Sequence, residues 1–298
     1  MHLALQESVT TGAIMPLNIC IAQPALVGSR NRQGAPKLAL VELLKDDYIA
    51  TVTITRPERR NAVTLEMMQE LEQISRNFIQ DEQTRAVIVR AQGEHFSVGA
   101  DLSSPPSVRG GASMLMRRRA AEFGAQLMRA IQEIPQPTIC AVQGIATGAG
   151  ACLTSACDFR VGADNVRIGY AEVKLGINLM WHAVPICVHL IGPARAKQMI
   201  MTGKLFDAAT LERWGFLDQV VPLADLDTTT RAIAEEYARL PPNSVQMIKK
   251  SINHLTGALD GAIMHMDADQ WVLTSVTEDY KEAVSAFFEK RSPNFTGS

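Results

Sequence analysis

Two segments rich in glycine and alanine each follow a short apolar run that predicts a β-strand. The first is Glu94–Leu102, after Ala86–Arg90, and the second is Gln143–Ala151, after Thr138–Val142. Small residues let a ligand come close to backbone N–H groups, and a helix that begins at the second segment adds positive potential. Two such N–H groups converging on one oxygen form an oxyanion hole, worth about 3 kcal/mol per donor. Each segment alone is also typical of an ordinary glycine turn.

Glu172 is the acidic residue with the surroundings of a general base. It lies between Tyr170 and Val173 in an apolar stretch. These neighbours should exclude water from the carboxylate and raise its pKa towards the range in which a general base works. For an isolated glutamate, a solvated loop acid is the alternative interpretation.

The remaining polar candidates each have a plainer interpretation. His182 could be an auxiliary acid or base, but a histidine just before an apolar helix is more often packed and hydrogen-bonded. His189 lacks the carboxylate companions that a metal site needs, so we predict no metal. The run Arg117–Arg119 could meet phosphates, yet three consecutive helical positions cannot share one face, which favours a solvated run. Four acids near the C-terminus are interpreted as surface residues: Asp267, Asp269, Glu278 and Asp279.

The elements expected to position these residues change from strands to helices along the chain. Two β-branched runs at 38–45 and 48–55 predict a β-hairpin, and Thr64 can cap a following helix. That helix should bury one face formed by Leu65, Met68, Leu71, Ile74 and Phe78. Two further strands are expected at Asp158–Val161 and Val166–Gly169. Helices are expected at Ser113–Glu133, from Gly150 to Ala156, and at Ala183–Ile191, Pro193–Thr202, Ala208–Trp214, Thr228–Leu240, Asn243–Leu255 and a final segment ending at Arg291.

Composition sets the class of protein. The chain has 298 residues, 47% hydrophobic and 20% charged, enough for one mixed α/β domain with a sizeable core. We expect a loosely ordered extension at 1–36, a core domain at 37–223 and a helical region at 224–298. A net charge of -2 argues against nucleic acid as a partner.

Neither a membrane nor a secretory route is expected. No apolar run approaches the ~18 residues that span a bilayer, and the N-terminus lacks a signal-peptide pattern. The cysteines show no CxxC pair, and the three in apolar segments predict reduced, buried thiols in a cytoplasmic protein. The five are Cys20, Cys140, Cys152, Cys157 and Cys187.

Taken together, the two loop segments resemble one family. Phe96–Leu102 (FSVGADL) is similar to the F-x-x-G-A-D-L segment of the crotonase (enoyl-CoA hydratase/isomerase) superfamily, and Gln143–Gly150 (QGIATGAG) to its N/Q-G-x-A-x-G-G-G turn. Supporting matches occur in the family's order from Leu38 to Phe295. They are Arg56-Pro57, Asn61-Ala62, Cys157-Asp158, Ala163-Asp164, Tyr170–Gly176, Thr202-Gly203, Ala208–Gly215, Val220–Pro222 and Phe287–Phe295.

This resemblance implies a ClpP/crotonase-like spiral of ββα units and a homotrimer or dimer of trimers formed by the C-terminal helices. It also implies an acyl-coenzyme A thioester as substrate, with no separate cofactor. The N–H groups of Ala100 and Ala149 would hold the thioester oxygen, although the second position is usually glycine. Acyl-CoA would be bound by Ala62, Asp101, Leu102, Gly148, Trp181, Phe287 and Lys290. Asp101 could equally be structural.

The resemblance also sets the choice of reaction. Family hydratases carry two glutamates, and the corresponding positions here are Cys152 and Glu172. A free thiol has a pKa of about 8.5, which burial raises, so Cys152 would orient water poorly. A single glutamate resembles the Δ3,Δ2-enoyl-CoA isomerases, as does the bulky pair Met180-Trp181. We therefore expect double-bond migration with Glu172 as the base. A hydratase and a non-catalytic acyl-CoA-binding protein are the alternatives.

Overall fold

A tight turn containing Asp47 joins the first two strands into the predicted hairpin. Asp47 adopts a φ of 51°, and Val41 pairs with Ile54 at the far end of the ladder. The computed structural model describes residues 39–103 and 113–298, so the extension expected at 1–36 lies outside the described residues. Residues from Ala39 onward form one compact unit. The boundary expected between 223 and 224 stays a prediction.

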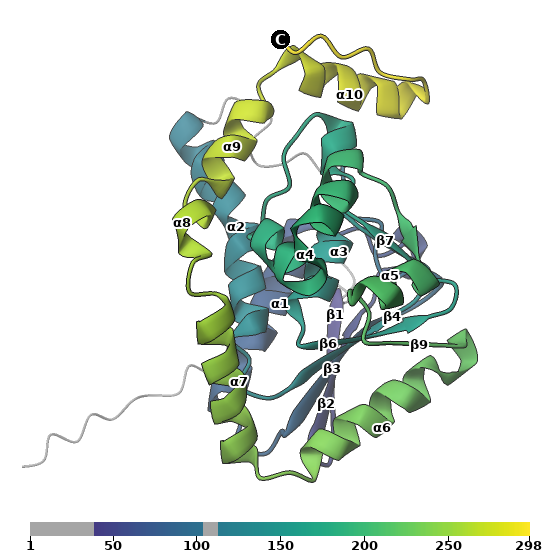
Figure 1. Ribbon diagram of the computed structural model, residues 1–298, viewed down its shortest axis with the longest axis vertical. Coiled ribbons are helices and arrows are strands. Elements are labelled where there is room, and N and C mark those ends of the chain that lie inside the picture. Colours follow the sequence, from purple (N-terminus) through teal and green to yellow (C-terminus); the bar gives the residue numbers. More distant parts are fainter. Residues whose placement is uncertain (1–38, 104–112) are drawn as a thin grey trace, which may run out of the picture. The chain divides into compact units, whose positions relative to one another are not determined.

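The main sheet has six strands in the order β1-β2-β3-β4-β6-β9 (Figure 1). The hairpin pair is antiparallel and every other pair is parallel. A second sheet of three short strands has the order β5-β7-β8. The strands are β1 (Val41–Asp46), β2 (Ile49–Ile54), β3 (Ala86–Ala91), β4 (Thr138–Val142), β5 (Ile145–Thr147), β6 (Phe159–Ala163), β7 (Arg167–Gly169), β8 (Phe206–Asp207) and β9 (Gln219–Val221).

Both faces of the main sheet are covered by helices. The α-helices are α1 (Leu65–Asn77), α2 (Met114–Gln132), α3 (Ala149–Ala156), α4 (Ala183–Thr202), α5 (Ala208–Trp214), α6 (Leu226–Ala238), α7 (Pro242–Thr256), α8 (Gly261–Met264), α9 (Asp267–Thr274) and α10 (Glu278–Glu289). In β3, Val87 and Val89 face the core shared with α1, α2 and α3, whereas Ala86 and Ile88 face α6 (Figure 1). This alternation follows from the two-residue period of a strand, and the predicted α/β class is confirmed.

Helix starts were predicted better than helix faces. The Thr64 hydroxyl accepts a hydrogen bond from Met67 N and caps α1, as expected. The expected apolar face was partly wrong, however, because Leu65 is 45% exposed and the buried positions are Met67, Leu71 and Ser75. Of the other expected positions, Leu71 and Phe78 are buried and Met68 and Ile74 pack against the core. The core-facing stripe therefore excludes Leu65 and includes Met67.

Two connections between elements need description. The glycine turn at 144–150 contains β5, which pairs in parallel with β7 before α3 begins. Gly192, with φ 76° and ψ 163°, breaks α4 between the two helices expected there. Within the described part of the chain, no helix is long and apolar enough to cross a membrane.

Candidate active site

The two glycine-containing loops lie against each other. Ser97 N donates to Ile145 O at 3.0 Å, and Thr147 N donates to Ser97 O at 3.0 Å. Gly150 has to lack a side chain, because a Cβ there would lie 2.7 Å from Ser97 O. Segments about fifty residues apart in the sequence are thereby joined at the carboxyl ends of β3 and β4, as the sequence predicted.

Among the backbone N–H groups of these loops, those of Ala100 and Ala149 have no protein acceptor in the described part of the chain. Val63 N donates to Gly99 O, and Val63 O accepts from Asp101 N, which makes a parallel β-bridge around Ala100. The N–H of Ala100 therefore points away from Val63. Ala149 is the first residue of α3, where N–H groups have no intrahelical partner.

The loop that carries Ala100 also lies close to the start of α3. A Cβ on Gly99 would lie 3.9 Å from Ala149 N and 3.0 Å from Thr147 O. Gly99 adopts a φ of 96°, which a side chain would strain. Both free N–H groups therefore belong to one small region of the molecule.

The Glu172 carboxylate lies beside the same region. Glu172 begins the 3-10 helix η3 (Glu172–Leu175), and a Cβ on Gly148 would lie 3.2 Å from its Oε1. Its Oε2 is buried and has no hydrogen-bond partner among the described residues. Burial raises the pKa of Glu172 from 4.5 to about 7, as its apolar neighbours indicated. This carboxylate can act as a general base near neutral pH.

Cys152 is buried in α3, with 1% of its surface exposed. Burial, followed by the charges of Glu172 and Asp267, raises the pKa of the Cys152 thiol well above its ordinary value. The thiol is protonated at neutral pH and cannot replace a carboxylate in activating water. Cys140, Cys157 and Cys187 are also free and buried.

Sequence reasoning missed one buried polar group here, Thr147. Its Oγ1 is buried and has no hydrogen-bond partner among the described residues, like Glu172 Oε2. Thr147 occupies a variable position of the quoted turn, so no residue-type signal marked it.

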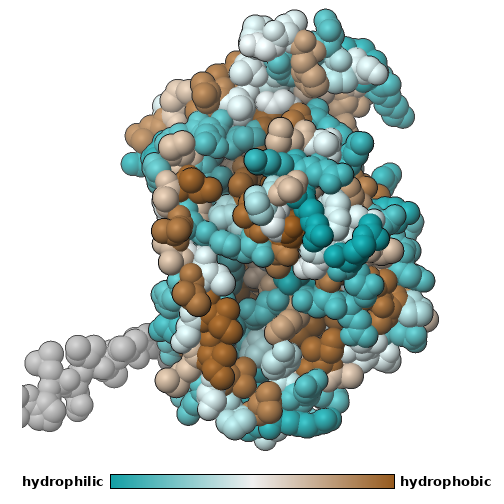
Figure 2. All heavy atoms as spheres, viewed as in Figure 1, coloured by the Kyte–Doolittle hydropathy of each residue, from teal (hydrophilic) through white to brown (hydrophobic). Residues whose placement is uncertain are grey.

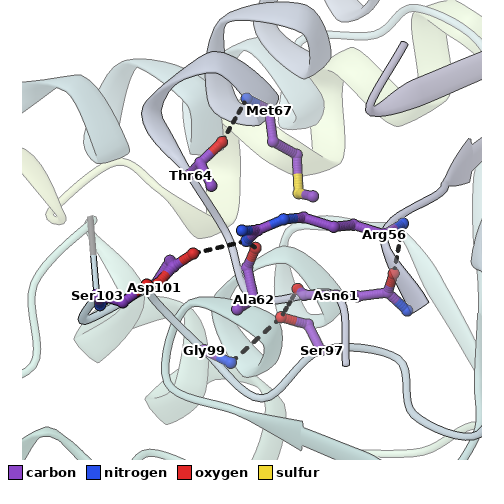
Figure 3. A network of polar contacts seen from close by, with 9 residues as sticks. All are labelled: Arg56, Asn61, Ala62, Thr64, Met67, Ser97, Gly99, Asp101 and Ser103. Carbon is purple, nitrogen blue, oxygen red and sulfur yellow. Dashed lines mark hydrogen bonds and ion pairs between the residues drawn. The ribbon is translucent and has the colours of Figure 1, made fainter. Parts of the chain in front are cut away.

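An ion pair fixes the loop that carries Ala100 (Figure 3). Arg56 Nη1 donates to Asp101 Oδ2 at 2.7 Å and to Ala62 O at 2.8 Å. Burial alone would raise the pKa of Asp101, but hydrogen bonds from Ser103 and Arg56 lower it to about 2. The structural alternative for Asp101 therefore fits its contacts, since its charge is bound to Arg56.

Asn61 completes this network and was not singled out from the sequence. Its Oδ1 accepts from Arg56 N at 2.9 Å, and its Nδ2 donates to Gln92 O and His95 O. Ser97 Oγ donates to Asn61 O and accepts from Gly99 N (Figure 3). The signal was present in the Arg56-Pro57 and Asn61-Ala62 matches, which were used only as a resemblance.

The other predicted binding residues lie at different distances from this centre. Ala62 is buried next to the Val63 bridge, and Leu102 is half-buried two residues after Ala100. Phe287 is 58% exposed on α10, and Lys290 ends that helix with a φ of 56°. No contact joins Phe287 or Lys290 to the loops among the described residues, so their binding roles stay predictions.

Trp181 packs against α2, where a Cβ on Gly124 would overlap its indole. Burial, and next the charge of Arg129, lower the pKa of the adjacent His182. His189 Nε2 pairs with Asp260 Oδ1 at 2.8 Å. His182 is thus packed, as the plainer interpretation predicted, whereas His189 has a carboxylate partner, Asp260, that was not expected from the sequence.

The arginine run was interpreted as mostly solvated, and Arg118 and Arg119 are indeed exposed. Arg117 Nη2 donates to Ser275 Oγ at 3.1 Å, and Arg118 pairs with Asp269. Arg117 therefore joins α2 to the end of α9, and Arg118 forms an exposed ion pair with the same helix.

Comparison with known proteins gives a consistent assignment. A family model described as enoyl-CoA hydratase/isomerase matches residues 45–298. The chain is 32% identical over 250 residues to the 1,2-epoxyphenylacetyl-CoA isomerase of Escherichia coli, covering 84% of this chain and 95% of that protein. It is 30% identical over 252 residues to the short-chain-enoyl-CoA hydratase of Clostridium acetobutylicum, with the same coverage of 84% and 95%.

A solved structure agrees. The crystal structure of an enoyl-CoA hydratase/isomerase from Pseudoalteromonas atlantica matches with a TM-score of 0.78 at 26% identity, covering 87% of this chain and 100% of that chain. The spiral ββα fold implied by the motifs is confirmed.

Proposed function

Since this chain belongs to the enoyl-CoA hydratase/isomerase family, an enzyme family that acts on acyl-CoA thioesters, we propose that it is an enoyl-CoA isomerase. It would move the double bond of a 3-enoyl-CoA to the 2 position. The observation that carries this proposal is a single buried carboxylate, Glu172, beside two unpaired N–H groups, with a protonated thiol at the position of a second acid.

The reaction needs one base and no added water. Ionised Glu172 takes a proton from C2 of the thioester, and the electrons of that bond form an enolate whose negative charge lies on the thioester oxygen. The N–H groups of Ala100 and Ala149 stabilise that oxygen. When the carbonyl re-forms, the electrons of the C1–C2 double bond of the enolate move to C2–C3. They push the C3–C4 double-bond electrons onto C4, which receives the proton from Glu172. The product contains the same atoms, with its double bond between C2 and C3.

Binding of coenzyme A is proposed for the surrounding backbone. Ala62, Asp101 and Leu102 would lie along the adenine and pantetheine, Gly148 near the thioester and Trp181 near the acyl chain. Phe287 and Lys290 would reach the nucleotide from the C-terminal helix. We propose no metal and no cofactor beyond the coenzyme A of the substrate. Reduced thiols support a cytoplasmic enzyme.

Self-association as a homotrimer or a dimer of trimers is also proposed. Figure 2 shows apolar side chains gathered along the edge where α7 lies. Helix α7 buries none of its own residues in this chain. The C-terminal helices expose Met247, Ile248, Ile252, Leu255, Leu259, Ile263, Leu273, Phe287 and Phe288.

Hydration is the second candidate, because the Clostridium acetobutylicum relative is named a hydratase. It would need a further group to hold water opposite Glu172.

The two functions can be told apart by their products. Purified protein should be given 3-enoyl-CoA and 2-enoyl-CoA separately, with products separated by chromatography and their masses measured by mass spectrometry. We expect migration without a gain in mass.

Glu172→Gln is the control for both substrates, because it removes the base and keeps the size of the side chain. It should lose about 10³-fold or more of the migration rate, within the range for acid–base catalysis. Gain of one water from 2-enoyl-CoA at a higher rate would instead establish a hydratase. If the protein binds acyl-CoA tightly but shows no turnover that depends on Glu172, the remaining conclusion is a non-catalytic acyl-CoA-binding protein.

A further inference from the structure

Two consecutive residues next to the site have an unfavourable backbone conformation. Trp181 and His182 adopt φ values of 66° and 59°, in the left-handed region that favours glycine. Such residues cost of order 1–3 kcal/mol each and persist only where the surroundings hold them. They connect the segment that follows Glu172 to the start of α4, and no side chain of that segment caps the helix.

The group that holds this turn comes from the C-terminal region. Asp267 Oδ2 accepts a hydrogen bond from His182 N at 2.9 Å, across 85 residues of sequence. Burial raises the pKa of Asp267, while the N–H groups of His182 and Trp181 act in the opposite direction. The interpretation of Asp267 as a surface acid was therefore wrong, because it is half-buried and bonds to the N-terminus of α4.

Asp267 is one of three residues on a single face of α9 that contact this segment. Gln270 Oε1 accepts from Asn178 Nδ2 at 3.4 Å, and Thr274 Oγ1 donates to Asn178 Oδ1 at 3.3 Å. Positions 267, 270 and 274 follow the i, i+3, i+7 spacing of one helix face. The polar face of α9 thus contacts the segment from Asn178 to His182 at both of its ends.

Helix α9 is itself attached to the core. Ala268 and Val272 are buried, and α9 packs on α2. Arg117 donates to Ser275 at the end of the helix. The pair between Arg118 and Asp269 is exposed to solvent and adds little to this attachment. Because the Trp181 indole rests on Gly124 of the same α2, the turn is held between α2 and α9.

The turn borders both the base and a large cavity. The charges of Glu172 and of Asp267 both reach Cys152, so the two carboxylates lie near one buried thiol. His182 and Asp267 also line a cavity of about 1340 Å³ between α2, α4 and the C-terminal helices. A shift of the turn would therefore move the Trp181 indole together with the part of the cavity wall that His182 forms.

We propose that Asp267 is a positioning residue, whose carboxylate holds the Trp181–His182 turn and thereby places Trp181 against the bound acyl group. The catalytic part of this inference rests on the proposed function. The conformational part concerns the free protein and can be measured without any turnover.

Variants of Asp267 separate position from charge. Asp267→Ala should reduce kcat/KM for a 3-enoyl-CoA by roughly 10- to 100-fold, as expected for a misplaced contact. Asp267→Asn keeps an oxygen that can accept from His182 N and should stay within about 3-fold of the wild type. The matched control is Asp269→Ala, which removes an acid from the first turn of the same helix and should have little effect.

A spectroscopic measurement tests the turn directly. The protein contains three tryptophans, so 5-fluorotryptophan labelling gives three ¹⁹F resonances, with that of Trp181 assigned by Trp181→Phe. Asp267→Ala should shift or broaden the Trp181 signal and leave Trp214 unchanged, whereas Asp267→Asn should leave both in place. This result is expected even if the wild type turns over no enoyl-CoA, an outcome that would refute only the proposed function.

Three results would overturn the inference. One is an unchanged Trp181 resonance in Asp267→Ala. Another is an equal loss of kcat/KM in Asp267→Ala and Asp269→Ala, since the hydrogen bond of Asp267 to His182 would then not be the cause. The third is an Asp267→Asn variant as slow as Asp267→Ala with Trp181 unmoved, because the charge and not the hydrogen bond would then matter.

Discussion

At the scale of single residues, the environment of Glu172 determines how the enzyme depends on pH. Its pKa is raised to about 7 by burial, and only the ionised form can accept a proton. We expect kcat/KM in the free enzyme to rise with pH up to about 7 and then to level off. Rates measured from pH 5 to 9 with a 3-enoyl-CoA test this, and a flat profile would contradict Glu172 as the base.

The same pKa predicts a dependence of stability on pH. Between 4.5 and about 7 the folded protein holds a proton on Glu172 that the unfolded chain has released. The free energy of unfolding therefore falls as pH rises through this window, by up to about 3 kcal/mol at 1.36 kcal/mol per pKa unit. Glu172→Gln should be more stable than the wild type at pH 8 and lose that advantage at pH 4, measured by urea unfolding. An advantage independent of pH would contradict this origin.

What the sequence could predict at this scale depended on where the relevant neighbours lie. Tyr170 lies two residues before Glu172 and is buried, so an apolar setting for the carboxylate could be inferred from residue types, although Val173 is 40% exposed. Asp267 bonds to His182 across 85 residues, and no local pattern distinguishes it from Asp269, which pairs with Arg118 at the surface. Such a contact exists only after α9 has packed on α2.

At the scale of elements, too, features set by neighbouring residues were easier to predict than features set by distant ones. The strands β2, β3 and β4 consist of five or six residues rich in β-branched types and were predicted to within one residue at each end, whereas β1 begins three residues later than predicted. The strands β5, β8 and β9 have two or three residues each and were not predicted, whereas β7, which also has three residues, was. Short strands of this kind carry too few residues for a periodic signal.

The junction between the two loops can be tested through Gly150. A Cβ at this position would lie 2.7 Å from Ser97 O. The Ser97 carbonyl is fixed by the hydrogen bond that it accepts from Thr147 N, so it cannot easily move away. Gly150→Ala should cost about 1–3 kcal/mol of stability through overpacking, and it should lower the migration rate by separating Ala100 from Ala149. Thermal unfolding and kcat measure the two effects.

Gly261→Ala provides the matched control for that change. Gly261 begins α8, and a Cβ there meets nothing within 4 Å. Alanine has the higher helix propensity, so this variant should be as stable as the wild type or slightly more so, with unchanged kcat. Equal behaviour of the two variants would mean that the loops do not require the close approach at Gly150.

At the scale of the whole molecule, the C-terminal helices have two kinds of surface. Helix α9 contacts the Trp181–His182 turn of its own chain, whereas α7 exposes apolar side chains to solvent. Ile248, Ile252 and Leu255 follow a four- and three-residue spacing on one face of α7 and are 59%, 54% and 79% exposed. An exposed apolar stripe of this kind is typical of an interface between proteins. If copies of this chain meet there, Ile252→Asp should place a charge in the contact and shift a trimer or hexamer towards monomers.

Light scattering after size-exclusion chromatography measures that shift over a range of protein concentrations. His254→Asp adds the same charge at an exposed position about 200° around α7 from Ile252, outside the apolar face, and should leave the assembly unchanged. Because Asp267 holds the Trp181 turn from within the same chain, an Ile252→Asp monomer should keep its Trp181 ¹⁹F resonance in place. A wild type that stays monomeric at high concentration would contradict the interface, whereas a Trp181 signal that changes on dissociation would show that the turn depends on a neighbouring copy.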